Sequence, residues 1–197
     1  MMQTKTFPEL ALLTLRDPLA AAAILSQWKL SREAIWTAVA LISVIVTILS
    51  TISNILFPVP AQIETLVGMP FMYLVIAAGG FIGTAYAVLW AGRLLGGQTS
   101  FDQLIVLMLW LQALRAVAQV AVLVLLVFAP VLASFLVLFV GIATIWVLVQ
   151  FINFSMQFDS IGRSVVTLFV AGLGLVIMLS FVLSALGFTA VGVPLNV

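Results

Sequence analysis

The chain of 197 residues is 65% hydrophobic and only 7% charged, and its mean hydropathy is +1.38. Water-soluble domains carry about 25% charged residues, so the composition excludes a large soluble domain and indicates an integral membrane protein. A net charge of +1 without a basic cluster excludes a nucleic-acid partner. The sequence has no Cys and no His, which excludes disulfides, Cys/His metal sites and imidazole acid–base chemistry.

The N-terminal arm, residues 1–33, reads as two short amphipathic helices. Thr6 with Glu9 forms a capping-box pattern at the first, and Asp17 followed by Pro18 suits the start of the second. Ser31 then caps the first long apolar run. Helices of this kind lie on the inner membrane surface, and two interpretations stay open: a lead-in to the first span, or a docking arm for a partner.

Five apolar runs predict five transmembrane helices behind this arm. A hydrocarbon core ~30 Å thick needs about 20 residues of helix. The runs cover about 34–57, 69–91, 104–128, 131–154 and 165–187. We therefore predict an all-α integral membrane protein, with a five-helix transmembrane domain over residues 34–197.

The boundary between the third and fourth runs allows an alternative. Residues 120–149 form one uncharged stretch that only Pro130 interrupts, so a single kinked helix would give four spans, with residues 104–119 lying on the surface. We favour a tight hairpin of two helices around Ala129 and Pro130, because a four-span chain would move Arg163 outside, against the positive-inside rule.

The basic residues set the predicted direction of the spans. With the N-terminus inside and the C-terminus outside, the outer loops carry no Lys or Arg, and every basic residue outside the spans lies inside: Lys5, Arg16, Lys29, Arg32, Arg93 and Arg163. Three aromatic residues, Trp28, Trp36 and Trp90, agree with an inner boundary at these positions. Trp110 and Trp146 lie deeper, where we expect them to pack between helices.

Polar and small residues mark two helix faces. The polar face of the first span consists of Ser43, Thr47, Ser50 and Asn54, whose spacing stacks them on one side that we expect to point inward. The second span carries a ridge of small residues, Gly79, Gly83, Ala87 and Ala91, which allows another backbone to approach closely. Helix packing is the leading interpretation of both faces, and a solute path or a subunit surface is the alternative.

The third span contains a polar stripe of Gln112, Arg115 and Gln119 near the middle of the bilayer. An Arg there costs about 2.5–3.5 kcal/mol on insertion scales, and no Asp or Glu lies within any span to pair with it. Gln150, Asn153, backbone carbonyls and lipid phosphates are the candidate partners. Three roles remain open: a structural contact, a partner or lipid contact, and a conduction path.

Residues that carry catalysis are missing from the sequence. It has no phosphate-binding glycine loop, no carboxylate pair inside a span, and no base near its Ser and Thr hydroxyls. We expect no catalytic residues, no cofactor and no metal. The expected function is that of a non-catalytic protein that works through contacts with lipids, other membrane subunits or copies of itself, either as an accessory subunit of a membrane complex or as an organiser of the membrane. The alternative is a small transporter or channel component that uses the polar residues of the first and third spans.

Three segments resemble the Yip1-domain family, in its bacterial branch. They are the Pro-containing element Arg16–Ala20, the loop Leu95–Phe101 (LGGQTSF), and the turn Gln157–Val165 (QFDSIGRSV). The resemblance implies five membrane helices and placement in a bacterial inner membrane. Eukaryotic members bind small GTPases through a longer N-terminus with an Asp-Leu-Tyr-Gly-Pro motif that this chain lacks, so GTPase binding is not implied. The third span here also lacks the Pro found in many members.

Overall fold

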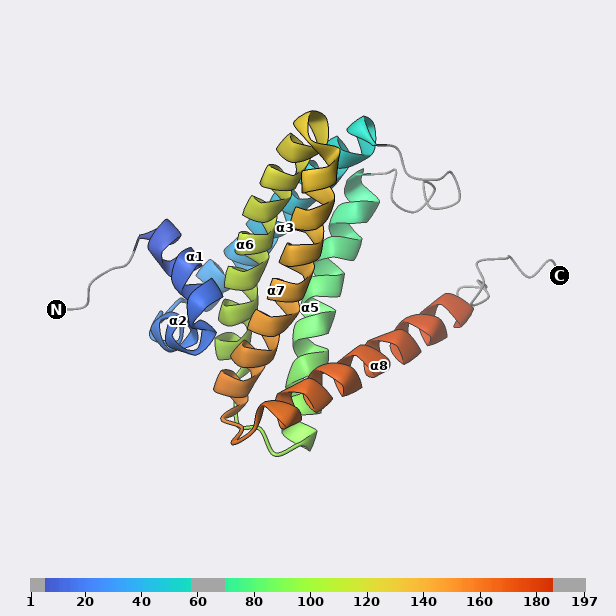
Figure 1. Cartoon of the computed structure of the whole chain (residues 1–197). Coiled ribbons are helices and arrows are strands. Elements are labelled where there is room, and N and C mark those ends of the chain that lie inside the picture. Colours follow the sequence, from blue (N-terminus) through green and yellow to red (C-terminus); the bar gives the residue numbers. More distant parts are fainter. Residues whose placement is uncertain (1–5, 58–69, 186–197) are drawn as a thin grey trace.

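Seven helices form the described part of the chain. The computed structural model describes residues 6–57 and 70–185, and these contain α1 (Phe7–Arg16), α2 (Pro18–Leu25), α3 (Arg32–Leu56), α5 (Pro70–Leu94), α6 (Phe101–Phe128), α7 (Pro130–Met156) and α8 (Ile161–Ala185) (Figure 1). Five of these, α3 and α5 to α8, are long and apolar enough to cross a membrane. The prediction of an all-α, five-span protein is confirmed. Lys5, Met69 and the C-terminal segment 186–197 lie outside the described residues.

The third and fourth spans are two helices joined by a tight hairpin. Ala129 has non-helical backbone angles (φ −151°, ψ 73°), and α7 starts directly after it at Pro130. Proline suits the first position of a helix because its fixed φ is already helical and its missing N–H is not needed there. The two helices run antiparallel and lie side by side (Figure 1). The hairpin interpretation is therefore confirmed over the single kinked helix.

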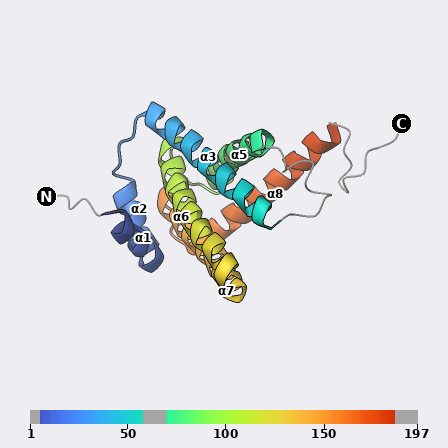
Figure 2. The same ribbon diagram turned by 90° about the horizontal axis from the view of Figure 1, so that it is seen from above.

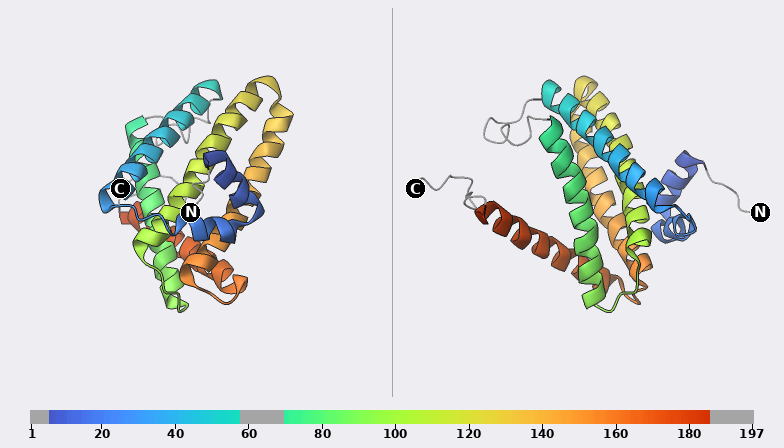
Figure 3. Two further views of the ribbon diagram at one scale, coloured as in Figure 1. Left: turned by 90° about the vertical axis from the view of Figure 1, so that its left-hand side faces the viewer. Right: turned by 180° about the vertical axis from the view of Figure 1, so that it is seen from behind.

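The α6–α7 hairpin occupies the centre of the molecule. Helix α3 packs against α6 and α5, and α5 also packs against α8. The arm helices α1 and α2 lie on the other flank of the hairpin (Figures 1 and 2). Helix α8 crosses α5 close to the first turns of α8 and then diverges from the bundle (Figures 1 and 3). Ser164, Thr167 and Ala171 of α8 are buried, whereas all residues from 176 to 181 are exposed.

Buried side chains gather toward one end of the spans. One cluster joins α5, α6, α7 and α8 through residues such as Val88, Met108 and Ile152. A second joins α3 to α6, with Val39 against Leu109. The parts of α6 and α7 near the turn between them are mostly exposed instead, as at Phe128, which is 82% exposed. Exposed apolar residues are expected on a surface that faces lipid, because lipid tails are as apolar as the side chains.

The arm packs against the membrane helices of its own chain. Leu10 of α1 and the residues Ala21, Ala22 and Leu25 of α2 form a third cluster with α6 and α7, for example with Phe151. The predicted caps are present, since Asp17 Oδ1 accepts a hydrogen bond from the Ala20 N–H (3.0 Å) and Ser31 Oγ accepts one from the Ala34 N–H (3.2 Å). The arm therefore contacts the bundle, and its contact with the membrane surface stays a prediction.

Candidate functional site

Arg115 lies near the middle of α6. Asp102 and Phe128 are each thirteen residues away, which is about 20 Å along a helix that rises 1.5 Å per residue. The side chain is exposed, and its Nη1 donates to Gln112 Oε1 over 3.4 Å, a long and neutral contact. In the described part of the chain, no carboxylate forms an ion pair with it. The guanidinium therefore has N–H donors without a described acceptor and a positive charge without a described counter-charge.

The other residues considered as partners of Arg115 have different surroundings. Gln119 is half-buried, one turn further along α6. Gln150 of α7 is buried, and its Oε1 has no donor among the described residues. Asn153 contacts the Ser164 hydroxyl at 3.1 Å and thereby links α7 to α8. Gln112 contacts Arg115 in the structure, whereas Gln119, Gln150 and Asn153 form no described hydrogen bond with it.

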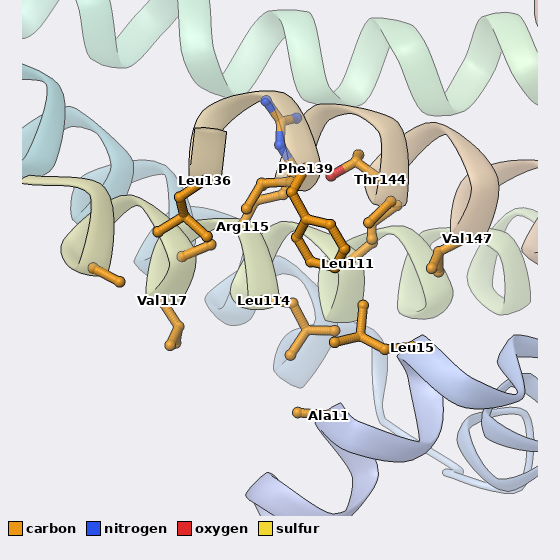
Figure 4. Close-up of a pocket in the computed structure, with 14 residues that line it drawn as sticks. Ala11, Leu15, Leu111, Leu114, Arg115, Val117, Leu136, Phe139, Thr144 and Val147 are labelled. Atoms are coloured by element: carbon orange, nitrogen blue, oxygen red, sulfur yellow. The ribbon is translucent and has the colours of Figure 1, made fainter. Parts of the chain in front are cut away.

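An apolar groove of about 270 Å³ runs between α1, α6 and α7 beside this site. Its walls include Ala11 and Leu15 of α1, Leu114 of α6 and Phe139 of α7. Arg115 also borders the groove, but Figure 4 shows its guanidinium extending in the direction away from α1. The charged group therefore points toward the side of the bundle where α5 lies.

Two hydroxyls on the polar face of α3 donate hydrogen bonds within the helix. Ser43 and Thr47 are buried, and their hydroxyls donate to the carbonyls of Val39 (2.7 Å) and Ser43 (2.8 Å) on the preceding turn. Ser50 and Asn54, further along the helix, are half-buried. Such bonds to the helix's own backbone let a hydroxyl remain inside a membrane at low cost.

The small-residue ridge of α5 is packed at one end and open at the other. Ala91 is fully buried and Ala87 packs against the same cluster. A Cβ added at Gly83 would meet only Leu175 Cδ2 at 3.9 Å, and one added at Gly79 would meet nothing within 4 Å. Within the described chain, the ridge is therefore packed at its alanines and open at Gly79, and the close approach of another backbone stays a prediction.

The loop after α5 ends that helix in a Schellman motif. Gly96 has a positive φ of 87°, and the N–H of Gly97 bonds to the Gly92 carbonyl at 2.8 Å. A Cβ on Gly97 would lie 2.7 Å from Met156 Sδ and 2.9 Å from the Gly92 carbonyl oxygen, so no larger residue fits there without movement. The Gln98 N–H also donates to the Met156 carbonyl at 3.2 Å, which joins this loop to the end of α7.

The turn after α7 repeats the same geometry. Gln157 has a φ of 55°, and the N–H of Phe158 bonds to the Asn153 carbonyl at 3.1 Å. The side chain of Phe158 is buried. At the start of α6, Phe101 stacks on Tyr86 with centroids 4.4 Å apart and also contacts Trp36. The segments 95–101 and 157–165 thus lie together at one end of the bundle.

One long-range contact was not predicted from the sequence. Trp110 Nε1 of α6 donates to Thr14 Oγ1 of α1 over 2.9 Å, and that hydroxyl donates in turn to the Leu10 carbonyl at 2.7 Å. Both partners are buried, and the rings of Phe7 and Trp28 contact the same indole. Trp110 is therefore a packing residue, as predicted, and it packs against the arm. The same prediction is wrong for Trp146, which is 50% exposed.

The described residues contain no group of three or more His, Cys, Asp or Glu side chains that could hold a metal ion. Five apolar spans with a single charge at mid-depth define a polytopic integral membrane protein. The family model of the Yip1 domain matches residues 12–182, so the chain belongs to the Yip1-domain family. Comparisons with curated proteins and with solved structures find no match.

Proposed function

We propose that this Yip1-family protein is a non-catalytic accessory subunit that works through contacts inside the membrane. Arg115 is the observation that carries this proposal. It is the one charged residue within the apolar spans, and its described partner, Gln112, is neutral. Intramembrane charges pair with other groups or mark functional pathways, and an anionic partner would neutralise the charge of this guanidinium.

A carboxylate on a transmembrane helix of another subunit suits Arg115 better than a lipid phosphate does. Arg side chains near a helix end reach the headgroup region by snorkelling. Arg115 lies about 20 Å along the helix from Asp102, which is more than half of a hydrocarbon core ~30 Å thick. A guanidinium and a carboxylate also form paired, charge-assisted hydrogen bonds that Gln112 does not supply.

Two further surfaces could contact a helix of another subunit. Gly79 has open space where a Cβ would stand, so a second backbone can approach α5 there. Residues 176–181 of α8 are exposed on every side of that helix. Lipid also covers such surfaces, so they support the proposal only in addition to the evidence from Arg115.

Measurement of native complex masses tests the proposal. The tagged protein is released from its own membranes with a mild detergent, and its mass is compared with that of Arg115→Leu and of the control Arg163→Gln. Arg163 is an exposed basic residue in the first turn of α8. We expect a defined complex with a second protein for the wild type and the control, and its loss in Arg115→Leu while the chain stays folded. An unchanged complex in Arg115→Leu contradicts the proposal.

A small transporter is the second candidate. It is favoured by the direction of the Arg115 guanidinium, which extends to the side of the hairpin where α5 lies (Figure 4). Charged residues that line solute paths face the bundle interior. A pure homo-oligomer that carries a solute flux in liposomes, with the flux lost in Arg115→Leu, would favour this candidate over the accessory subunit.

We also propose that the protein lies in a bacterial inner membrane with its N-terminus inside. Arg93 and Arg163 support this direction, because they lie at the end of the bundle where α5 finishes and α8 begins. Cytoplasmic loops carry an excess of such residues.

A further inference from the structure

A second cavity lies where the arm meets the first turns of α3 and α6. Its volume is about 320 Å³, and its lining includes Lys29, Asp102, Gln103 and Trp28 above an apolar floor formed in part by Ile35. Ile35 is buried, whereas Lys29, Asp102 and Trp28 are exposed. The cavity is therefore open at a charged rim and closed by apolar side chains beneath it.

The two charges on this rim have opposite signs and remain separate. Lys29 follows the end of α2, and Asp102 is in the first turn of α6. Both line the cavity, yet in the described part of the chain they form no ion pair with each other. A group that fits between them must present a negative end to Lys29 and a positive end to Asp102.

We infer that this cavity binds the headgroup of a zwitterionic phospholipid of the phosphoethanolamine type. The phosphate accepts hydrogen bonds from the Lys29 ammonium, and the primary ammonium of the headgroup donates to the Asp102 carboxylate. Hydrogen bonds between ionised partners are shorter and stronger than neutral ones. Gln103 supplies an amide at the same rim, and Trp28 is of the residue type that prefers the headgroup region.

A lipid is the source of this headgroup because of where the cavity lies. The spans begin at this rim, with Ile35 in the first turns of α3 and Val106 in those of α6. The charged side chains of the rim match the headgroup, and the acyl chains would lie against the exposed apolar surface of the spans. This inference is independent of the role of Arg115, which lies further along α6.

Native mass spectrometry of the purified full chain tests the inference with three added lipids that share the same acyl chains. Phosphatidylethanolamine has both charges, phosphatidylglycerol lacks the amine, and phosphatidylcholine lacks its N–H donors. We expect the wild type to prefer phosphatidylethanolamine to phosphatidylglycerol by roughly tenfold, equivalent to ~1.4 kcal/mol. Asp102→Asn should remove this preference, and Lys29→Gln should weaken the binding of both lipids.

The controls are Glu33→Gln and Arg32→Gln, because both residues are exposed charges in the first turn of α3 that do not line the cavity. Their lipid preference should equal that of the wild type. Equal binding of phosphatidylethanolamine and phosphatidylglycerol by the wild type would overturn the inference, as would an unchanged preference in Asp102→Asn. Displacement of the lipid by an equal concentration of soluble phosphoethanolamine would overturn its assignment to a lipid.

Discussion

Removing the Thr14 hydroxyl should release the arm from the bundle. Thr14→Val keeps the shape of the side chain but leaves Trp110 Nε1 without the acceptor that now lies 2.9 Å away. Both residues are buried, so water does not replace the lost partner in the closed state. An unsatisfied buried donor costs ~1–3 kcal/mol, which predicts an increase of about 5- to 150-fold in opening of the arm.

Hydrogen exchange measured by mass spectrometry on the detergent-solubilised protein detects this opening. Amides of α1 and α2 should exchange faster in Thr14→Val by that factor, whereas those in α5 should not change, because local opening is limited to the segment that loses its contact. Thr14→Ser is the matched control, since it removes a methyl group and keeps the hydroxyl. Equal exchange of the arm in Thr14→Val and Thr14→Ser would refute the reasoning.

Two further predictions concern the loops and the direction of the chain. Gly97→Ala places a Cβ 2.7 Å from a Met side chain and 2.9 Å from a backbone oxygen, so thermal unfolding of the purified protein should show a loss of stability of ~1–3 kcal/mol. Gly79→Ala places its Cβ in open space and should show no loss of stability. Equal melting temperatures of the two variants would contradict this prediction. Reporter fusions after Gln62 and Val197 should report outside and a fusion after Ser160 inside, and an inside result at Val197 would contradict the five-span topology.

The spans were predictable because composition decides them. Runs of about 20 apolar residues leave a helix as the stable structure in lipid, and Pro130 marks the turn between α6 and α7. The Gly-Gly loop was recognisable as a pattern, although the sequence does not show that Met156 fills the space beside Gly97. That contact joins segments about sixty residues apart, and no local preference encodes it.

The site was only partly predictable for the same reason. Spacing alone placed Gln112 and Arg115 on one stripe, because residues three apart are neighbours on a helix. The Thr14–Trp110 bond joins residues 96 positions apart, so nothing in the sequence pointed to it beyond two polar atoms in apolar surroundings. The open space at Gly79 depends on where α8 diverges, which tertiary packing decides.

Photo-crosslinking beside Arg115 tests the central claim most directly. A photo-reactive residue replaces Gln119, which is one turn from Arg115 and half-buried, and the tagged protein is irradiated in living cells. The account predicts a discrete protein crosslink whose captured peptide is a transmembrane segment with an Asp or Glu, and predicts its loss when Arg115→Leu is added. Crosslinks to lipid alone, or a protein crosslink that persists in Arg115→Leu, would contradict the account.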